Sequence, residues 1–284
     1  MTRELAPLRG LIAATFTPFH HDGSVDTAAI RPMVDQLLDR GIGGLYVLGS
    51  TGEGVSLTHD ERCSVAEAFV AASAGRLPVI IHCGSESLRQ AQLLATHAQE
   101  VGADAVSAVS PLYFKPDSVK TLVASMAQIA SGAPQLPFYY YHLPSVTGVE
   151  CNVVEFLELG SQQIPTLRGM KFTSPRVDQL RACLDFAGDQ FEVLWGVDEM
   201  LLSGLKAGVQ AAIGSTYNFA APIYHRLMQA WAAGDLEEAQ QQQACAQAMV
   251  DTFMAYGSRA AQKAMMSMVG VDCGPTRLPI APLD

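Results

Sequence analysis

Eight short apolar runs, separated by longer helical patterns, constrain the fold of this chain more than any other feature. The apolar runs predict strands at 10–19, 43–50, 78–84, 103–111, 136–144, 167–174, 191–198 and 211–216. They lack the polar alternation of a sheet with one solvent-facing side, so both faces of each strand should be buried, as in a parallel sheet. Eight βα units favour a closed (β/α)8 TIM barrel over an open doubly wound sheet, which is the alternative.

Helical patterns occupy the intervals between the strands and the end of the chain. Apolar residues spaced by three and four predict helices at 27–40, 58–75, 86–101, 117–130, 153–160, 176–187 and 199–207. Residues 225–270 are rich in Ala, Gln and Met and are almost entirely helical in pattern. We therefore expect a barrel with the active site at 1–224 and an extension of C-terminal helices at 225–284, packed on the barrel.

Charge and composition exclude several classes of partner. The formal net charge is −10 and no basic cluster occurs, so nucleic acid and anionic membranes are poor partners. No apolar run reaches about 18 residues, the length that a membrane span requires. Six cysteines lie far apart without a C-x-x-C pair, and the N-terminus lacks the apolar segment of a signal peptide. These features predict free thiols and a cytoplasmic protein.

One lysine lies inside an apolar run, in the stretch LRGMKFTSPRV. Lys171 could extend its amine to solvent from a strand end or pair with a core carboxylate. However, its place late in the sixth strand should direct the side chain into the mouth of the barrel, where this fold carries its chemistry. Desolvation there disfavours the charged ammonium, and a neutral amine attacks ketones to give a Schiff base.

A Schiff-base lysine needs a proton shuttle and, for a keto acid, a holder for the substrate carboxylate. Tyr141 ends the neighbouring strand, and because side chains alternate, Tyr140 should face the opposite side from Tyr139 and Tyr141. The turn GSTGEG at 49–54 offers successive backbone N–H groups to an anion. A tyrosine can equally be packing, and the turn can equally be a plain glycine-rich connection. The turn lacks the Gly-Lys-Ser/Thr ending of a phosphate-binding P-loop.

Five motifs together carry a family resemblance. GSTGEG at 49–54, FYYYHLPSVTGV at 138–149, GMKFTS at 169–174, GVDEM at 196–200 and GSTYN at 214–218 follow one another in order, each near a predicted strand end. With GPTRLP near the C-terminus, the match runs from about residue 8 to residue 280. The chain resembles the N-acetylneuraminate lyase family, a branch of the dihydrodipicolinate synthase-like class I aldolases.

The resemblance implies roles for individual residues. Lys171 would form the Schiff base with the C2 ketone of open-chain sialic acid, and Tyr141 would take the proton from the C4 hydroxyl as the C3–C4 bond breaks. Ser50 and Thr51 would hold the carboxylate, with one of their hydroxyls linked to Tyr141, and Tyr113 would enter the proton relay of a partner subunit. The expected contacts to the sugar are Thr173, Gly196, Asp198, Glu199 and Ser215. The family's usual assembly is a homotetramer, a dimer of dimers.

Simpler readings of these residues remain open. Asp198 and Glu199 could merely favour a helix N-terminus, although acidic side chains also accept hydrogen bonds from sugar hydroxyls. Thr173 and Ser215 could be ordinary strand-end hydroxyls. His82 and Cys83 have no third ligand at metal spacing, so we predict no metal and no cofactor beyond the covalent adduct on Lys171.

The expected substrate is a keto-acid sugar. The synthase branch places an arginine two residues after the proline of the fifth strand's motif, where this chain has Val146, which cannot hold a second carboxylate. Cleavage of N-acetylneuraminate to N-acetylmannosamine and pyruvate is therefore expected. Aldolases or dehydratases of 2-keto-3-deoxy sugar acids are the alternative, with dihydrodipicolinate synthase a weaker one. A non-catalytic keto-acid-binding protein on the same barrel is a hypothesis of another class.

Overall fold

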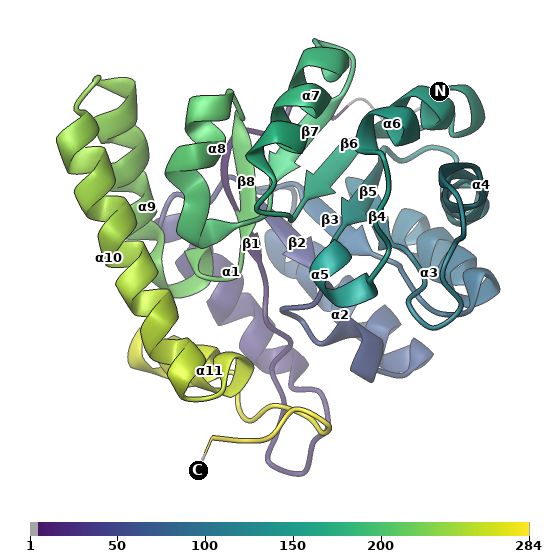
Figure 1. The fold of residues 1–284 in the computed structure, drawn as a ribbon. Helices are drawn as coiled ribbons and strands as arrows, with labels where there is room; N and C mark the ends of the chain where they lie inside the picture. The colour runs from purple at the N-terminus through teal and green to yellow at the C-terminus, as the bar shows by residue number, and fades with distance from the viewer. Residues whose placement is uncertain (1–4, 284) are drawn as a thin grey trace.

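Eight parallel strands form the centre of the computed structural model, which describes residues 5–283 (Figure 1). They pair in chain order, and pairing of the last strand with the first closes the barrel. The closed barrel confirms the predicted fold and rules out the open sheet. The strands are β1 (Gly10–Ala14), β2 (Gly44–Val47), β3 (Val79–His82), β4 (Ala105–Val109), β5 (Phe138–His142), β6 (Leu167–Phe172), β7 (Glu192–Trp195) and β8 (Ala211–Gly214).

Side chains on the strands alternate between the barrel interior and the layer beneath the helices. Tyr139 and Tyr141 belong to the cluster that fills the barrel, whereas Tyr140 belongs to the outer cluster and stacks on Phe156, with ring centroids 4.3 Å apart. His142 is buried on the outer side, next to Phe172. The alternation expected for the three tyrosines is confirmed, and it turns Tyr141 inward.

Helices surround the barrel and continue past it (Figure 1). The helix α2 begins with the capping box of Thr58 and Glu61, in which each side chain accepts a hydrogen bond from the other's backbone N–H. The helices are α1 (Ile30–Asp39), α2 (His59–Ser73), α3 (Leu88–Glu100), α4 (Val119–Ala130), α5 (Pro144–Thr147), α6 (Val153–Gln163), α7 (Val177–Ala187), α8 (Leu201–Ala207), α9 (Tyr217–Ala232), α10 (Leu236–Ala255) and α11 (Ser258–Met268).

Two differences from the expected elements have physical causes. The strands are shorter than the apolar runs because the ends of those runs are buried in loops. Phe16 and Phe19, for example, are buried after β1, and the Phe19 N–H donates to the Cys273 carbonyl and not to a strand. The one-turn helix α5 was not predicted. It begins at Pro144, whose fixed φ suits the first helical position, and it ends at Gly148 with φ +61°.

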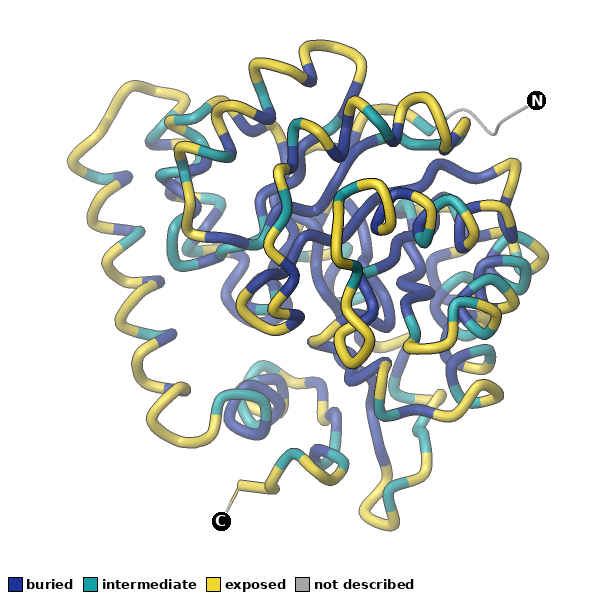
Figure 2. Tube along the Cα trace, turned by 45° about the vertical axis from the view of Figure 1, so that its right-hand side comes forward, coloured by how far each residue is buried: buried dark blue, intermediate teal, exposed yellow. Residues whose placement is uncertain are grey.

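The C-terminal helices pack on one side of the barrel, and α9 runs across the expected division between residues 224 and 225. Only one face of α10 is buried, including Ala246, Val250 and Phe253, and its outer face is exposed (Figure 2). The α11 helix lies at the end of α10 and is followed by the C-terminal segment (Figure 1). Within residues 5–283, no helix is both long enough and apolar enough to cross a membrane.

Candidate active site

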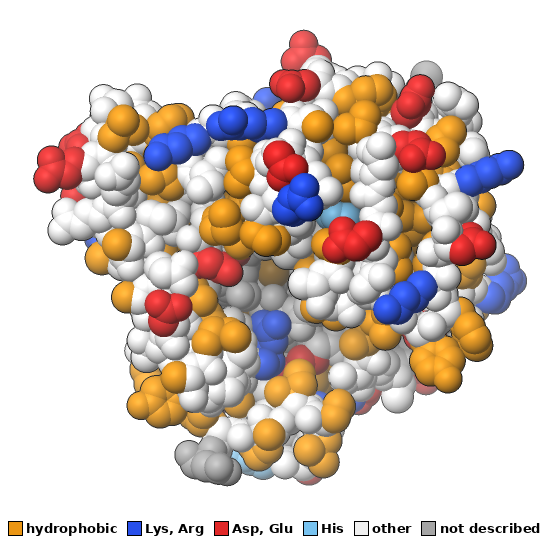
Figure 3. Space-filling view, in the orientation of Figure 1, with side chains coloured by type: hydrophobic (Ala, Val, Ile, Leu, Met, Phe, Trp, Pro, Cys, Tyr) orange, Lys and Arg blue, Asp and Glu red, His pale blue; other side chains and the backbone are white. Residues whose placement is uncertain are grey.

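A cavity of about 400 Å³ opens at the carboxyl ends of the strands. Its walls come from the barrel on one side and from α10 and α11 on the other, and Figure 3 shows the hollow between these two parts. Every predicted site residue except Tyr113 lines it. These are Ser50, Thr51, Tyr141, Lys171, Thr173, Gly196, Asp198, Glu199 and Ser215.

Lys171 lines this cavity. Its side chain is buried, and its Nζ lies 4.2 Å from the centroid of the Tyr141 ring and 4.4 Å from that of the Tyr46 ring. Lys171 is the register partner of Tyr141 between β6 and β5, so the backbone pairing itself sets the two side chains beside each other. No carboxylate forms an ion pair with Lys171 in the part of the chain that the structure describes.

Tyr141 is held by its ring and not by its hydroxyl. The ring makes edge contacts with Tyr46 and His82, with centroids 5.8 Å and 6.0 Å apart. Its hydroxyl has no hydrogen-bond partner among residues 5–283, so the hydroxyl link expected from Ser50 or Thr51 is not formed in the single chain. The phenol therefore faces the cavity with its donor and acceptor available.

Two uncharged side chains, Tyr46 and His82, pack next to Lys171 and Tyr141. The Tyr46 hydroxyl lies 3.0 Å from Ser107 Oγ, and burial raises the pKa of Tyr46 well above its ordinary value. His82 Nε2 accepts a hydrogen bond from the Val109 N–H, which leaves Nδ1 to donate to the Leu48 carbonyl. Burial lowers the pKa of His82 to about 3, so the imidazole is neutral. Sequence analysis did not assign these residues to the site, although the inward position of Tyr46 on β2 follows from the same alternation as that of Tyr141.

The Ser50-Thr51 turn is shaped by its backbone. Leu48 and Glu53 have φ values of +65° and +53°, and a Cβ added at Gly54 would lie 1.9 Å from the Leu48 carbonyl oxygen. The N–H groups of Ser50 and Thr51 donate no hydrogen bond to any described residue. Successive free N–H groups in a turn form a concave anion site, as expected for a carboxylate holder.

Glu53 anchors this turn to the C-terminal part of the chain. Its carboxylate is fully buried and lies 3.1 Å from Lys263 Nζ of α11. It also accepts a hydrogen bond of 3.0 Å from the Arg277 backbone N–H. The pairing of Glu53 with Lys263 was not predicted, because it joins segments 210 positions apart and has no local pattern.

Asp198 begins the opposite wall of the cavity, after β7. One of its carboxylate oxygens accepts hydrogen bonds from the backbone N–H and the hydroxyl of Thr216, at 2.9 Å and 2.7 Å. Burial raises the pKa of Asp198 to about 6, although the bonds from Thr216 oppose that shift. A Cβ added at Gly214 would lie 2.0 Å from the other carboxylate oxygen, so a glycine is required there.

Thr173 presents an unsatisfied hydroxyl to the cavity. Its Oγ1 is buried and has no hydrogen-bond partner among the described residues. A Cβ added at the neighbouring Gly196 would lie 1.9 Å from this oxygen. Only a glycine at position 196 therefore leaves space for the Thr173 hydroxyl. A buried hydroxyl without a partner is costly, and a ligand hydroxyl would satisfy it.

Tyr113 lies away from this cavity, in the loop between β4 and α4. Its side chain is 78% exposed and packs edge-on against Phe114, which is 84% exposed. The backbone N–H groups of Leu112 and Tyr113 donate to the Glu86 carboxylate at 3.0 Å each, which fixes the loop. One chain by itself therefore does not bring Tyr113 to Lys171.

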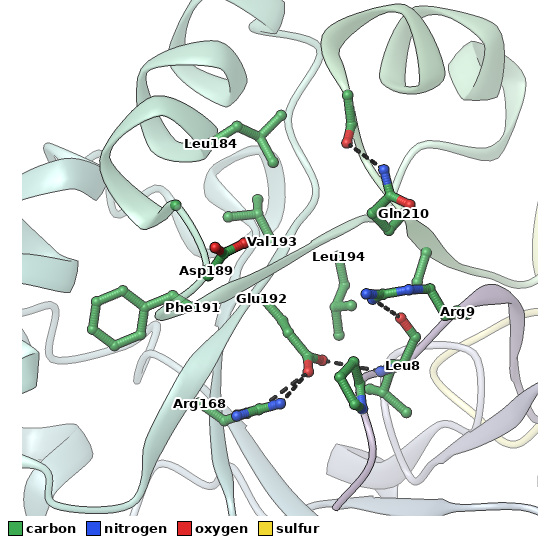
Figure 4. Close-up of a pocket in the computed structure, with 14 residues that line it drawn as sticks. Leu8, Arg9, Arg168, Leu184, Asp189, Phe191, Glu192, Val193, Leu194 and Gln210 are labelled. Atoms are coloured by element: carbon green, nitrogen blue, oxygen red, sulfur yellow. Dashed lines mark hydrogen bonds and ion pairs between the residues drawn. The ribbon is translucent and has the colours of Figure 1, made fainter.

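A second cavity, of about 540 Å³, lies at the amino ends of β7 and β8 (Figure 4). At its centre Arg168 donates two hydrogen bonds to one oxygen of Glu192, and Tyr139 donates to the other at 3.0 Å. Its central charges are thus satisfied within the chain. In this fold, contacts at the amino end of the barrel serve stability, and catalysis occurs at the opposite end. This larger cavity is not the candidate active site.

Metal binding finds no support in the described residues. No group of three or more His, Cys, Asp or Glu side chains there could hold an ion. His82 and Cys83 are both buried, and each ring nitrogen of His82 is occupied by a backbone group.

Comparison with known proteins shows which family the chain belongs to. The model of the Dihydrodipicolinate synthetase family matches residues 7–284. The N-acetylneuraminate lyase of Sus scrofa is 38% identical over 278 residues, which cover 96% of this chain and 87% of that protein. The structure of Proteus mirabilis N-acetylneuraminate lyase superposes with a TM-score of 0.95 at 40% identity, covering 98% of this chain and 94% of that one.

The description of a more distant structure names a catalytic lysine. It is the Ruminococcus gnavus "sialic acid aldolase catalytic lysine mutant", which is 26% identical with a TM-score of 0.93 and covers 98% of this chain and 91% of that one. The agreement in sequence extends over nearly the whole chain and the agreement in structure over the whole barrel. The chain belongs to the Dihydrodipicolinate synthetase family, and within that family it is similar to N-acetylneuraminate lyases.

Proposed function

We propose that this protein is a carbon–carbon lyase that cleaves N-acetylneuraminate reversibly to N-acetylmannosamine and pyruvate. The observation that carries the proposal is the placement of Lys171 Nζ 4.2 Å from the Tyr141 ring, in one cavity with the Ser50-Thr51 turn. The relatives named as N-acetylneuraminate lyases support the choice of sugar acid. The Ruminococcus gnavus aldolase, described as having a catalytic lysine, supports the nucleophile.

In the proposed reaction, Lys171 attacks the C2 ketone of the open-chain substrate. Loss of water from the carbinolamine leaves an iminium, which withdraws electrons from the neighbouring C3–C4 bond. Tyr141 takes the proton from the C4 hydroxyl as that bond breaks. C4 becomes the aldehyde carbon of N-acetylmannosamine, and the bonding electrons pass into an enamine on Lys171. Protonation of C3 and addition of water then release pyruvate and restore the amine.

The remaining cavity residues would bind the two ends of the substrate. The Ser50-Thr51 turn offers its N–H groups and hydroxyls to the carboxylate. Thr173, Asp198, Glu199 and Ser215 would contact the sugar hydroxyls. Gly196 would contribute its backbone and the space beside Thr173.

The mechanism requires no cofactor, because the iminium formed on Lys171 accepts the electrons of the broken bond and becomes an enamine. The same proposal includes a cytoplasmic homotetramer, built as a dimer of dimers, in which Tyr113 completes the proton relay of a partner subunit. The exposure of Tyr113 and Phe114 supports that role, since a large apolar pair on a fixed loop is suited to an interface. The barrel would carry the chemistry, with the helical extension packed against it.

A pyruvate-release assay tests the proposed function. The purified enzyme is offered N-acetylneuraminate and, separately, a set of 2-keto-3-deoxy sugar acids, and pyruvate is measured with lactate dehydrogenase and NADH. We expect the highest kcat/KM with N-acetylneuraminate. A higher value with another sugar acid would transfer the assignment to that substrate. Absence of pyruvate from every compound would point to a keto-acid-binding protein.

A further inference from the structure

The C-terminal extension contributes a basic side chain to the candidate active site. Ser258, Arg259 and Gln262 of α11 line the same cavity as Lys171. Lys171 and Arg259 are the two basic side chains among the described residues that line this cavity, and Asp198 and Glu199 are its acidic ones.

Arg259 lies over the mouth of the barrel. Its guanidinium interacts electrostatically with Glu53, Tyr141 and Asp198, which follow or end three different strands, β2, β5 and β7. Burial lowers the pKa of Arg259, and these three groups counteract that shift. Arg259 therefore lines the cavity and lies within electrostatic reach of residues from three strand ends.

The Arg259 guanidinium makes few hydrogen bonds and no ion pair with the described residues. Its Nη1 donates a hydrogen bond of 2.7 Å to Gln262 Oε1, one turn further along α11. No carboxylate lies within ion-pair distance of it in residues 5–283. Arg259 is half-buried, and a guanidinium carries five N–H donors in a planar fork that fits a carboxylate, so donors beyond the one bonded to Gln262 are available to an anion. The site is therefore suited to receiving an anion.

We propose that Arg259 supplies the positive charge by which this cavity selects an anionic keto acid over a neutral ketone. The inference rests on the proposed function and concerns the substrate's carboxylate. The net charge of −10 and the acidic wall at Asp198 and Glu199 oppose binding of an anion, so a local cation must offset them. The Ser50-Thr51 turn offers only neutral donors, and the nitrogen of Lys171 is bonded to C2 in the iminium, so it is not free to bind the carboxylate as an ammonium would. Arg259 thereby gives the helical extension a part in substrate choice.

The test varies the charge of the ligand and the charge of residue 259 together. Schiff bases formed with pyruvate and with its uncharged methyl ester are trapped on Lys171 by sodium cyanoborohydride, and the half-saturating concentration of each is measured by mass spectrometry. The variants are Arg259→Gln and Arg259→Met, which remove the charge, and Arg259→Lys, which keeps it. Arg181→Gln, an exposed position on α7, is the matched control for the loss of one positive charge.

We expect Arg259→Gln and Arg259→Met to raise the half-saturating concentration of pyruvate by about 10- to 100-fold, the range for a hydrogen bond to a charged group. The half-saturating concentration of the methyl ester should change much less, so these variants should lose most of the preference for the acid over the ester. Arg259→Lys should retain most of the preference, and Arg181→Gln should retain all of it.

If either charge-removing variant raised the half-saturating concentrations of pyruvate and of the ester by the same factor, Arg259 would only pack the cavity wall, and the proposal would be wrong. An unchanged half-saturating concentration for pyruvate would also overturn it. The two variants guard against misfolding, because methionine keeps the aliphatic stem that glutamine shortens. If the wild-type enzyme traps no pyruvate at all, the Schiff-base function itself fails, which is a distinct result.

Discussion

At the scale of single residues, the site pairs a lysine without an acidic partner with a tyrosine whose hydroxyl is available. Lys171 is surrounded by the rings of Tyr46 and Tyr141, with no carboxylate within the described residues to bind its amine. A carboxylate at that position would stabilise the ammonium and oppose nucleophilic attack. The amine thus faces the cavity without a salt bridge that a substrate ketone would have to displace.

Tyr141→Phe removes the proposed proton shuttle and leaves the ring packing intact. We expect kcat for N-acetylneuraminate to fall by about 10²- to 10⁴-fold, the usual contribution of a general acid–base group, with a much smaller change in KM. Tyr140→Phe is the matched control, because Tyr140 faces the outer layer and packs on Phe156. Retention of wild-type turnover by Tyr141→Phe would contradict the assigned role.

Asp198 gives the folded enzyme a measurable pH dependence. Its pKa is about 6 in the folded chain against an ordinary 3.8, so the folded chain retains a proton that the unfolded chain loses first. The stabilisation is complete below about pH 4 and is lost as the pH rises through 6, a fall of about 3 kcal/mol in the free energy of unfolding. Asp198→Asn should remove this component from urea unfolding curves measured at fixed protein concentration between pH 4 and 7. A constant difference between the two proteins over that range would refute it.

Several site residues could be predicted from the sequence because their signals are local. Lys171 was identified by a charge in an apolar run, and Tyr141 by the two-residue period of a strand. His82 and Tyr46 were not placed in the site, since either side chain could equally be ordinary packing. Tyr113 was assigned by resemblance alone, and its exposure in one chain leaves its role to the assembly.

At the scale of elements, α11 is the part of the structure whose importance the sequence did not indicate. Its helical pattern was predicted, but its position over the barrel mouth depends on contacts between distant segments. Arg259 enters the active-site cavity, and Lys263, one turn further on, pairs with Glu53 beneath the Ser50-Thr51 turn. Under these proposals, the same helix contributes to substrate selection and supports the turn that would hold the carboxylate.

Breaking the buried pair should be more harmful than replacing both of its members. Lys263→Met leaves the Glu53 carboxylate without its partner, and we expect a loss of about 3–5 kcal/mol in the free energy of unfolding. The double variant Glu53→Gln/Lys263→Met should lose clearly less, as measured by urea unfolding. The exposed pair Arg176–Asp178 provides the control, because Arg176→Met should leave stability unchanged. Equal losses in the single and double variants would show that the charges are not coupled.

At the scale of the whole molecule, the closed barrel was the most predictable feature, because eight repeated units with doubly buried strands leave few other solutions. The assembly was expected from the family resemblance alone, because contacts between subunits leave no such repeated pattern in the sequence. Tyr113 and Phe114 form an exposed pair on a loop fixed by Glu86. Under the proposal, this pair enters the active site of a neighbouring subunit.

Mixed assemblies of two impaired variants test that arrangement. Tyr113→Phe should lower kcat, and Lys171→Ala should abolish it. Subunits of the two variants, dissociated and reassembled together, should regain activity, because the Lys171→Ala subunit supplies an intact Tyr113 to its partner's intact Lys171. Mixtures no more active than the sum of their parts would argue that Tyr113 acts within its own chain or not at all.

The central claim, that Lys171 forms a covalent imine with the keto acid, is tested most directly by trapping that imine. The enzyme is incubated with pyruvate and borohydride, digested, and analysed by mass spectrometry. The account predicts a reduced pyruvate adduct on the peptide that contains Lys171, and no adduct in Lys171→Ala. Absence of the adduct from the wild-type enzyme, or its appearance on another lysine, would contradict the account.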